Sequence, residues 1–175
     1  LANTRGPEAA RRADLVPHLV HLHEVYRALL KERSRRGAMD FETTETQIVC
    51  DDSGRIEKIV PRARTEAHKL IEESMLAANV CAAEFITAGE HPSLFRVHEG
   101  PTPEKRLILQ GYLKALGIGL HLSDDPAPGE YQAIAQATQD RPDATQIHTM
   151  LLRSMQQAIY TASNAGHFGL AYEAY

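Results

Sequence analysis

The sequence predicts an α+β fold in which helices dominate. Long runs repeat apolar residues at helical spacing, one pair of strand-like runs flanks a turn, and the other alternating runs are short. The chain has 175 residues, of which 43% are hydrophobic and 24% are charged. That balance is typical of a globular domain with a buried core, and it excludes collagen-like, low-complexity and fully disordered chains.

The N-terminal part is expected to consist of a flexible lead-in and one helix. Residues 1–13 show little apolar periodicity, so the domain is expected to cover residues 14–175. A helix is predicted over 15–35, with Pro17 in its first turn and Gly37 after its basic end. Its apolar residues recur at helical spacing: Leu19, Leu22, Tyr26, Leu29 and Leu30.

A β-hairpin is predicted next. Two strand-like runs, 45–50 and 55–60, lie on either side of the tetrapeptide Asp-Asp-Ser-Gly at 51–54. Adjacent aspartates invite a metal site, but this tetrapeptide is typical of a turn, in which carboxylates accept backbone N–H groups and glycine supplies a positive φ. The strands are expected to be half buried through three isoleucines, Ile48, Ile56 and Ile59.

The longest predicted helix covers 65–88, with Thr65 as its cap. It is apolar almost all round, so we expect it inside the domain. Helical geometry places four charged residues in one narrow sector, the expected solvent stripe: Glu66, Lys69, Glu73 and Glu84. Glu72 projects outside this sector, between His68 and Asn79, in a row that we expect to be partly buried.

The second half of the chain is predicted to contain one short strand, three helices and a glycine-rich loop that re-enters a sheet. Alternation predicts the strand, and a Thr-Pro pair followed later by glycine marks the start and end of the first helix. These elements are expected as a strand at 94–98, helices at 103–117, 129–139 and 143–160, and the loop at 163–172.

Composition and motifs exclude several classes of function. A net charge of −4 lacks the global basic signature of a nucleic-acid binder, but composition alone leaves function open. No apolar stretch is long enough to cross a membrane. Cys50 and Cys81 form no Cys-x-x-Cys pattern and are expected to be reduced thiols in the core of a cytoplasmic protein. The sequence contains no nucleophile elbow, no glycine-rich phosphate loop and no convincing set of metal ligands, so no complete active site is expected within it.

Four separated stretches carry a more specific pattern. They are PRARTEAHKLIEESMLAAN at 61–79, LFRVHE at 94–99, DRPD at 140–143, and LLRSM at 151–155 leading to GHFGLAY at 166–172. In this order they resemble the RNB catalytic domain of the ribonuclease II and ribonuclease R family, closest to the bacterial ribonuclease R branch. The resemblance covers nearly everything from residue 14 onward.

The resemblance implies an exoribonuclease. Members of this family are hydrolytic, processive 3′→5′ exoribonucleases that draw single-stranded RNA into a channel and release nucleoside 5′-monophosphates with a divalent metal, here expected to be Mg2+. Their metal-holding aspartates and an arginine segment are expected to lie before Leu1 and after Tyr175. The chain is therefore expected to be a central part of an RNB catalytic domain, truncated at both ends and inactive alone.

The resemblance also implies residues that contact RNA. Phe41 matches an aromatic residue that stacks on bases, and a hydrophobic plug is the local alternative. Glu72 matches a glutamate near the sugar of the 3′-terminal nucleotide, where a carboxylate that accepts a 2′-OH would favour RNA over DNA. The local alternative for Glu72 is an ion pair with Arg64 or with His68 that fixes the helix.

Arg96 and His98 are two further candidates for RNA contact. They alternate with Phe95 and Val97 on the predicted strand, where they would contact phosphates or form its outward polar face.

Single-stranded RNA is the expected partner, with no preference for DNA and no membrane. Two rival interpretations are a non-catalytic RNB-like module that binds RNA or regulates another protein, and a helical protein-interaction domain unrelated to RNA. A sheet truncated at both ends also exposes edges and apolar surface, which predicts a non-physiological dimer.

Overall fold

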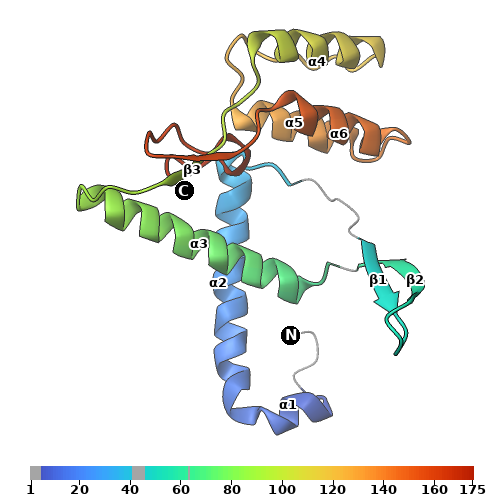
Figure 1. Ribbon diagram of the computed structural model, residues 1–175, viewed down its shortest axis with the longest axis vertical. Helices are drawn as coiled ribbons and strands as arrows, with labels where there is room; N and C mark the ends of the chain where they lie inside the picture. Colours follow the sequence, from blue (N-terminus) through green and yellow to red (C-terminus); the bar gives the residue numbers. More distant parts are fainter. Residues whose placement is uncertain (1–4, 41–45, 63) are drawn as a thin grey trace. The chain divides into compact units, whose positions relative to one another are not determined.

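A computed structural model describes residues 5–40, 46–62 and 64–175 (Figure 1). The elements follow in the order α1 (Pro7–Arg11), η1 (Ala13–Leu15), α2 (Val16–Arg36), β1 (Thr46–Cys50), β2 (Ile56–Pro61), α3 (Glu66–Ala88), β3 (Phe95–Val97), α4 (Pro103–Ala115), α5 (Pro128–Thr138), α6 (Ala144–Ser154), β4 (Ile159–Thr161) and η2 (Phe168–Leu170). The strands pair antiparallel as β1 with β2 and β3 with β4. The predicted α+β class, mostly helical with a hairpin and short strands, is confirmed.

The chain divides into two compact units. The first unit consists of Leu1–Arg27 and Glu42–Ser74, and the second consists of Ala28–Phe41 and Met75–Tyr175. Helices α2 and α3 each begin in the first unit and end in the second.

A short helix lies within the residues expected to be a lead-in without regular structure. Pro7 is in the first turn of α1, where its missing N–H costs nothing. Glu8 accepts from Arg11 at 2.8 Å and also pairs with Arg12. Apolar periodicity did not predict α1 because the contacts that favour it are ionic.

The predicted hairpin and its turn are confirmed. Asp51 Oδ1 accepts from the backbone N–H groups of Ser53 and Arg55, both at 2.9 Å. Gly54 has a φ of +79°, which a residue with a side chain adopts only at a cost. The carboxylate of Asp51 therefore closes a turn, as its sequence context predicts.

Burial of the hairpin was predicted wrongly. Ile48, Ile56 and Ile59 are 55%, 62% and 62% exposed. A ribbon of two strands has no further strand or layer of its own to cover its faces, so β-branched residues form the strands without being buried. Cys50 and Cys81, expected in a core, are also exposed.

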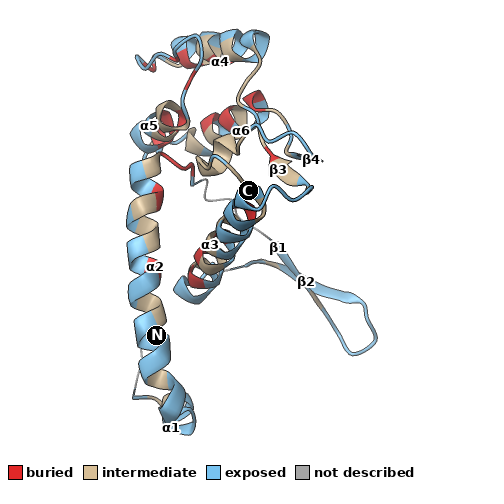
Figure 2. Cartoon of the chain, turned by 90° about the vertical axis from the view of Figure 1, so that its left-hand side faces the viewer, coloured by how far each residue is buried: buried red, intermediate tan, exposed pale blue. Residues whose placement is uncertain are grey.

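Helix α3 is not an interior helix as predicted. Ile71, Met75 and Phe85 are 54%, 59% and 76% exposed. Figure 2 shows exposed and intermediate positions along α3. The buried residues share one face at intervals of three or seven positions: Leu70, Glu73, Leu76 and Ala83. No helix in the described ranges has both the length and the apolar character needed to cross a bilayer.

The main hydrophobic core lies in the second unit, where α6 packs against both α4 and α5. Figure 2 shows the buried positions of α5 and α6 in red. Six of the core residues are 0–1% exposed: Leu109, Leu113, Tyr131, Ile134, Ile147 and Leu151. Such a core is the main favourable contribution to the stability of this unit.

The predicted ends of α4 are confirmed. Thr102 Oγ1 accepts from the N–H of Lys105 at 3.3 Å, and Pro103 occupies the first helical position. Gly117 follows the helix with a φ of +70°.

The last helix is shorter than the predicted 143–160. It ends at Ser154 because Met155 adopts an extended backbone, with φ −75° and ψ 163°. Residues 159–161 then pair with β3, which places Tyr160 opposite Arg96. Ile159, predicted to face inward, lies on this strand rather than on the predicted helix, and it is 56% exposed.

The C-terminal segment lies along β3, as expected for a loop that re-enters a sheet. The N–H of Arg96 donates to the carbonyl of Tyr175 at 2.7 Å. The N–H of His98 donates to Gly166 at 3.1 Å, and the carbonyl of His98 accepts from Phe168 at 2.7 Å. These bonds connect residues about 70 to 80 positions apart in the sequence.

Candidate functional site

Glu72 lies on α3 within the first unit and is paired with an arginine. Its Oε2 atom is 2.5 Å from the guanidinium of Arg64, and the two side chains are 40% and 34% exposed. One of the two ion pairs expected from the sequence is therefore present. A half-exposed carboxylate keeps lone pairs that can accept from a sugar hydroxyl, so the ion pair does not remove Glu72 from a binding surface.

His68 contacts Thr65 at the start of α3. Its Nδ1 atom accepts from the N–H of Thr65 at 3.1 Å and lies 2.8 Å from the Thr65 hydroxyl. These contacts satisfy backbone and side-chain groups where α3 begins. His68 thus organises the start of the helix that carries Glu72.

Glu73 contradicts the predicted solvent stripe, because it is only 4% exposed. Within the first unit its carboxylate interacts electrostatically with Tyr26 of α2, which is 2% exposed. Burial, together with the carboxylates of Glu66 and Glu73, raises the pKa of the Tyr26 phenol. The missed signal is spacing: Glu73 lies three positions after Leu70, on the face that α3 buries.

Arg96 lies in the second unit beside an open pocket of about 410 Å3. Its guanidinium carbon is 4.9 Å from the centre of the Tyr160 ring. We call this cavity the Arg96 pocket, and six of its residues define it: Asn79, Ile86, Phe95, Arg96, Tyr160 and Tyr175.

A polar pair forms one side of the Arg96 pocket. The side-chain amide of Asn79, on α3, donates to the hydroxyl of Tyr175 at 3.1 Å. An asparagine amide has a second N–H and a carbonyl oxygen beyond that bond. The pocket therefore combines a cation, exposed ring surface and amide groups.

His98 is held in a different environment from Arg96, although only one residue separates them. Its Nδ1 atom accepts from the N–H of Gly169 at 3.1 Å, and its ring meets that of His167 edge-on at 4.9 Å. Burial lowers the pKa of His98, with a smaller contribution from the charge of Arg96. At neutral pH His98 is therefore uncharged and offers no positive charge to a phosphate.

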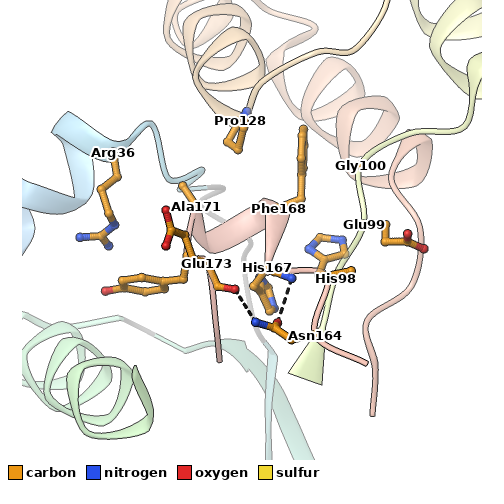
Figure 3. Close-up of a pocket in the computed structure, with 13 residues that line it drawn as sticks. Arg36, His98, Glu99, Gly100, Pro128, Asn164, His167, Phe168, Ala171 and Glu173 are labelled. Carbon is orange, nitrogen blue, oxygen red and sulfur yellow. Dashed lines mark hydrogen bonds between the residues drawn. The ribbon is translucent and has the colours of Figure 1, made fainter. Parts of the chain in front are cut away.

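His98 lines a second cavity, and hydrogen bonds join some of the residues that line it (Figure 3). It measures about 660 Å3. Asn164 accepts from the N–H of Gly166 at 3.0 Å and donates to the carbonyl of Glu173 at 2.8 Å. The guanidinium of Arg36 lies 4.1 Å from the Tyr172 ring centre. We interpret these contacts as a clasp that orders the C-terminal segment.

His167, which lines the same cavity, predicts that the chain loses stability in acid. Burial, followed by the nearby His98, lowers the pKa of His167 to about 4 from 6.5. The contribution of neutral His167 to the free energy of unfolding is fully present above pH 6.5. It is lost as the pH falls from 6.5 to about 4, because over this interval the imidazole binds a proton in the unfolded chain but not in the folded one. Solvent screening of a half-buried ring reduces the expected loss of unfolding free energy to about 1–2 kcal/mol.

Urea unfolding at pH 7.0, 5.5 and 4.5 measures this loss in the unchanged chain and in His167→Asn. Asparagine can replace Nδ1 as the acceptor for the N–H of Leu170, which lies 3.2 Å away, but it does not titrate. The variant should lose less stability over this interval. An equal loss in both proteins would contradict the assignment to His167.

Two further points concern Phe41 and metal binding. Phe41 lies outside the described residues, so its role in base stacking stays a prediction. Among the residues that the structure describes, no group of three or more His, Cys, Asp or Glu side chains is arranged to hold a metal ion. These residues do not fit a metal centre, and we derive no chemical step through one.

Comparison with known proteins identifies the family. The family model for the RNB domain matches residues 2–175. The chain belongs to the RNB-domain family. Ribonuclease R of Escherichia coli is 44% identical over 163 residues, and that of Vibrio cholerae is 45% identical over 161 residues. These alignments cover 93% and 92% of this chain but only 20% of each relative, so the chain spans about a fifth of their length.

Solved structures show a similar fold. The apo form of Mycoplasma genitalium RNase R matches with a TM-score of 0.86 and 24% identity, covering 92% of this chain and 25% of that one. Its complex with ribose-methylated single-stranded RNA matches with the same score and identity. These matches show that the chain shares a fold with a segment of the solved RNase R structures.

The sequence did not predict the residues that surround Arg96 in this RNB-domain chain. Tyr160 was assigned to a helix, and Asn79 was noted only as a neighbour of Glu72 on α3. No local signal joins Tyr160 to Arg96, since 64 positions separate them. The β3–β4 pairing creates the contact.

Proposed function

We propose that this chain forms part of the RNA-binding wall of a hydrolytic, processive 3′→5′ exoribonuclease that acts on single-stranded RNA. The observation that carries the proposal is the RNB-domain match across residues 2–175, supported by ribonuclease R relatives at 44–45% identity. One structural relative was solved with ribose-methylated single-stranded RNA. The whole enzyme would use a divalent metal, for which Mg2+ is the proposed ion, and would work in the cytoplasm on RNA rather than DNA.

The described residues are suited to binding rather than to cleavage. Arg64, which precedes α3, and Glu72 on α3 form a half-exposed pair, and Arg96 lies beside an open pocket. Hydrolysis of a phosphodiester requires charge stabilisation and an activated water, which metal ions supply in many nucleases. We therefore propose that the 175-residue chain alone binds RNA without degrading it.

An assay with 5′-labelled single-stranded RNA tests this proposal. The full-length protein in which the chain occurs should convert the RNA to nucleoside 5′-monophosphates from the 3′ end in the presence of Mg2+. The 175-residue chain should bind the same RNA, with affinity that falls as salt rises, and should release no nucleotides. RNA binding by the full-length protein without degradation would favour the non-catalytic RNB-like alternative, and no binding by either would contradict both.

Glu72 is proposed to favour RNA over DNA by accepting the 2′-OH of the terminal nucleotide. In the full-length protein, Glu72→Gln should reduce the RNA-over-DNA ratio of degradation rates about tenfold, in the range of a hydrogen bond to a charged group. Arg64→Gln removes the ion-pair partner and retains the carboxylate, so it should change this ratio less than twofold. Equal effects of the two changes would show that Glu72 acts only through its pair with Arg64.

A further inference from the structure

The Arg96 pocket contains one positive charge and no acidic side chain. Within the described residues Arg96 forms no ion pair, and its guanidinium lies 4.9 Å from the Tyr160 ring centre. Stacking on a ring fixes the plane of a guanidinium while its edge N–H groups stay available as donors. A positioned cation without a carboxylate partner is suited to an anion with several oxygens, such as a phosphate.

Aromatic surface lies next to this cation. Tyr160 is 66% exposed although it belongs to a paired strand. Phe95 and Tyr175 also line the pocket. Exposed aromatic rings beside an arginine are the combination on which nucleic-acid bases stack in proteins that bind single strands.

Amide and hydroxyl groups provide hydrogen bonds at the same place. Asn79 uses one amide N–H to bond the Tyr175 hydroxyl. Its other N–H and its carbonyl oxygen match the donors and acceptors of a base edge or a sugar. Because Asn79 comes from α3 and Tyr160 from β4, tertiary structure brings these functions together.

We propose that the Arg96 pocket binds a single nucleotide, with its phosphate on Arg96, its base against Tyr160 and a polar edge on Asn79. This proposal rests on the proposed RNA-binding function and adds a subsite to it. A volume of about 410 Å3 is within the range of small-molecule sites. The shared ligand chemistry is a nucleoside phosphate, supplied either by a nucleotide within an RNA strand or by a free nucleoside 5′-monophosphate.

Binding to the 175-residue chain distinguishes these sources. The probes are a fluorescein-labelled oligoadenylate of ten nucleotides and, separately, AMP. Arg96→Gln and Tyr160→Ala should each weaken oligonucleotide binding about tenfold, and Arg96→Gln should lower the salt dependence by about one phosphate contact. Tyr160→Phe retains the ring and should bind within about twofold of the unchanged chain.

Arg153→Gln is the matched control. Arg153 is an exposed arginine on α6 that does not line the pocket, so this change removes the same charge from the same unit. It should weaken oligonucleotide binding less than twofold. A larger loss with Arg96→Gln than with Arg153→Gln separates a local contact from a general loss of positive charge.

An NMR titration of the unchanged chain tests the site without any substitution. Adding AMP or the oligonucleotide should shift the side-chain amide signals of Asn79 and the backbone amide of Tyr160, both of which belong to the pocket. This measurement decides the question even if a variant fails to fold. Shifts with the oligonucleotide alone assign the subsite to the RNA strand, whereas shifts with AMP as well show that it accepts a free nucleotide.

Failure of this proposal is distinguishable from failure of the proposed function. If the chain binds RNA but Arg96→Gln and Tyr160→Ala behave like Arg153→Gln, and the Asn79 signals do not shift, RNA binds elsewhere and the pocket assignment is wrong. If the unchanged chain binds neither probe, the RNA-binding function itself is contradicted, and the subsite with it.

Discussion

Tyr131→Ala is expected to lower the free energy of unfolding by about 3–5 kcal/mol, the range for removal of a large aromatic side chain from a core. Tyr131 is 0% exposed in the centre of the second unit. Its ring meets the Phe168 ring edge-on at 5.4 Å, and its hydroxyl lies 2.8 Å from that of Ser154. The substitution removes ring packing, including the contact with Phe168, and leaves a cavity.

Tyr131→Phe is the matched control, because it retains the ring. Ser154 donates its hydroxyl proton to the Leu151 carbonyl at 2.7 Å, so Tyr131 is the donor to Ser154. Loss of that donor should cost about 1 kcal/mol. Urea unfolding followed by near-ultraviolet circular dichroism measures both variants. A similar loss for the two changes would mean that the hydrogen bond, rather than the ring, stabilises this core.

Gly37→Ala is expected to cost about 2–5 kcal/mol, for two reasons that add. Gly37 ends α2 with a φ of +79°, a conformation that costs an L-residue about 1–2 kcal/mol. A Cβ atom there would lie 2.8 Å from the Cα of Gly129, which is backbone and cannot rotate away. Forcing the two segments apart adds about 1–3 kcal/mol of overpacking.

Gly117→Ala separates the two causes. Gly117 has a φ of +70°, but a Cβ atom there would have no neighbour within 4 Å. It should therefore cost only the conformational part, about 1–2 kcal/mol. Thermal unfolding of both variants measures the difference. If the two alanine variants lose the same stability, close approach at Gly129 has no role in the requirement for glycine at position 37.

Local sequence rules predicted the elements whose signals are contained within a few residues. The Thr102-Pro103 start of α4 depends on a side chain and a backbone group three positions apart. The turn at 51–54 depends on Asp51 bonding Ser53 and Arg55. Such contacts form in the same way wherever the segment lies, so a pattern of residues is sufficient to predict them.

Burial and long-range pairing were predicted poorly. Glu73 was assigned to solvent, yet it is only 4% exposed. Glu72 was expected in a partly buried row, and its side chain is 40% exposed, in agreement with that expectation. The apolar composition of α3 could not reveal which face would be covered, because that depends on where other elements pack. The end of α6 was missed for the same reason, since pairing with β3 decides the conformation of residues 159–161.

By itself, the sequence determined the family and the types of most elements, because motifs and helical periodicity are properties of residues near one another in the chain. It also singled out Glu72 and Arg96. Only the tertiary structure decided which carboxylate is buried, that burial lowers the pKa of His98, and that Arg96 stacks on Tyr160 and shares a pocket with Asn79. Those outcomes depend on contacts between residues tens of positions apart, whose formation depends on the packing of whole elements rather than on any local pattern.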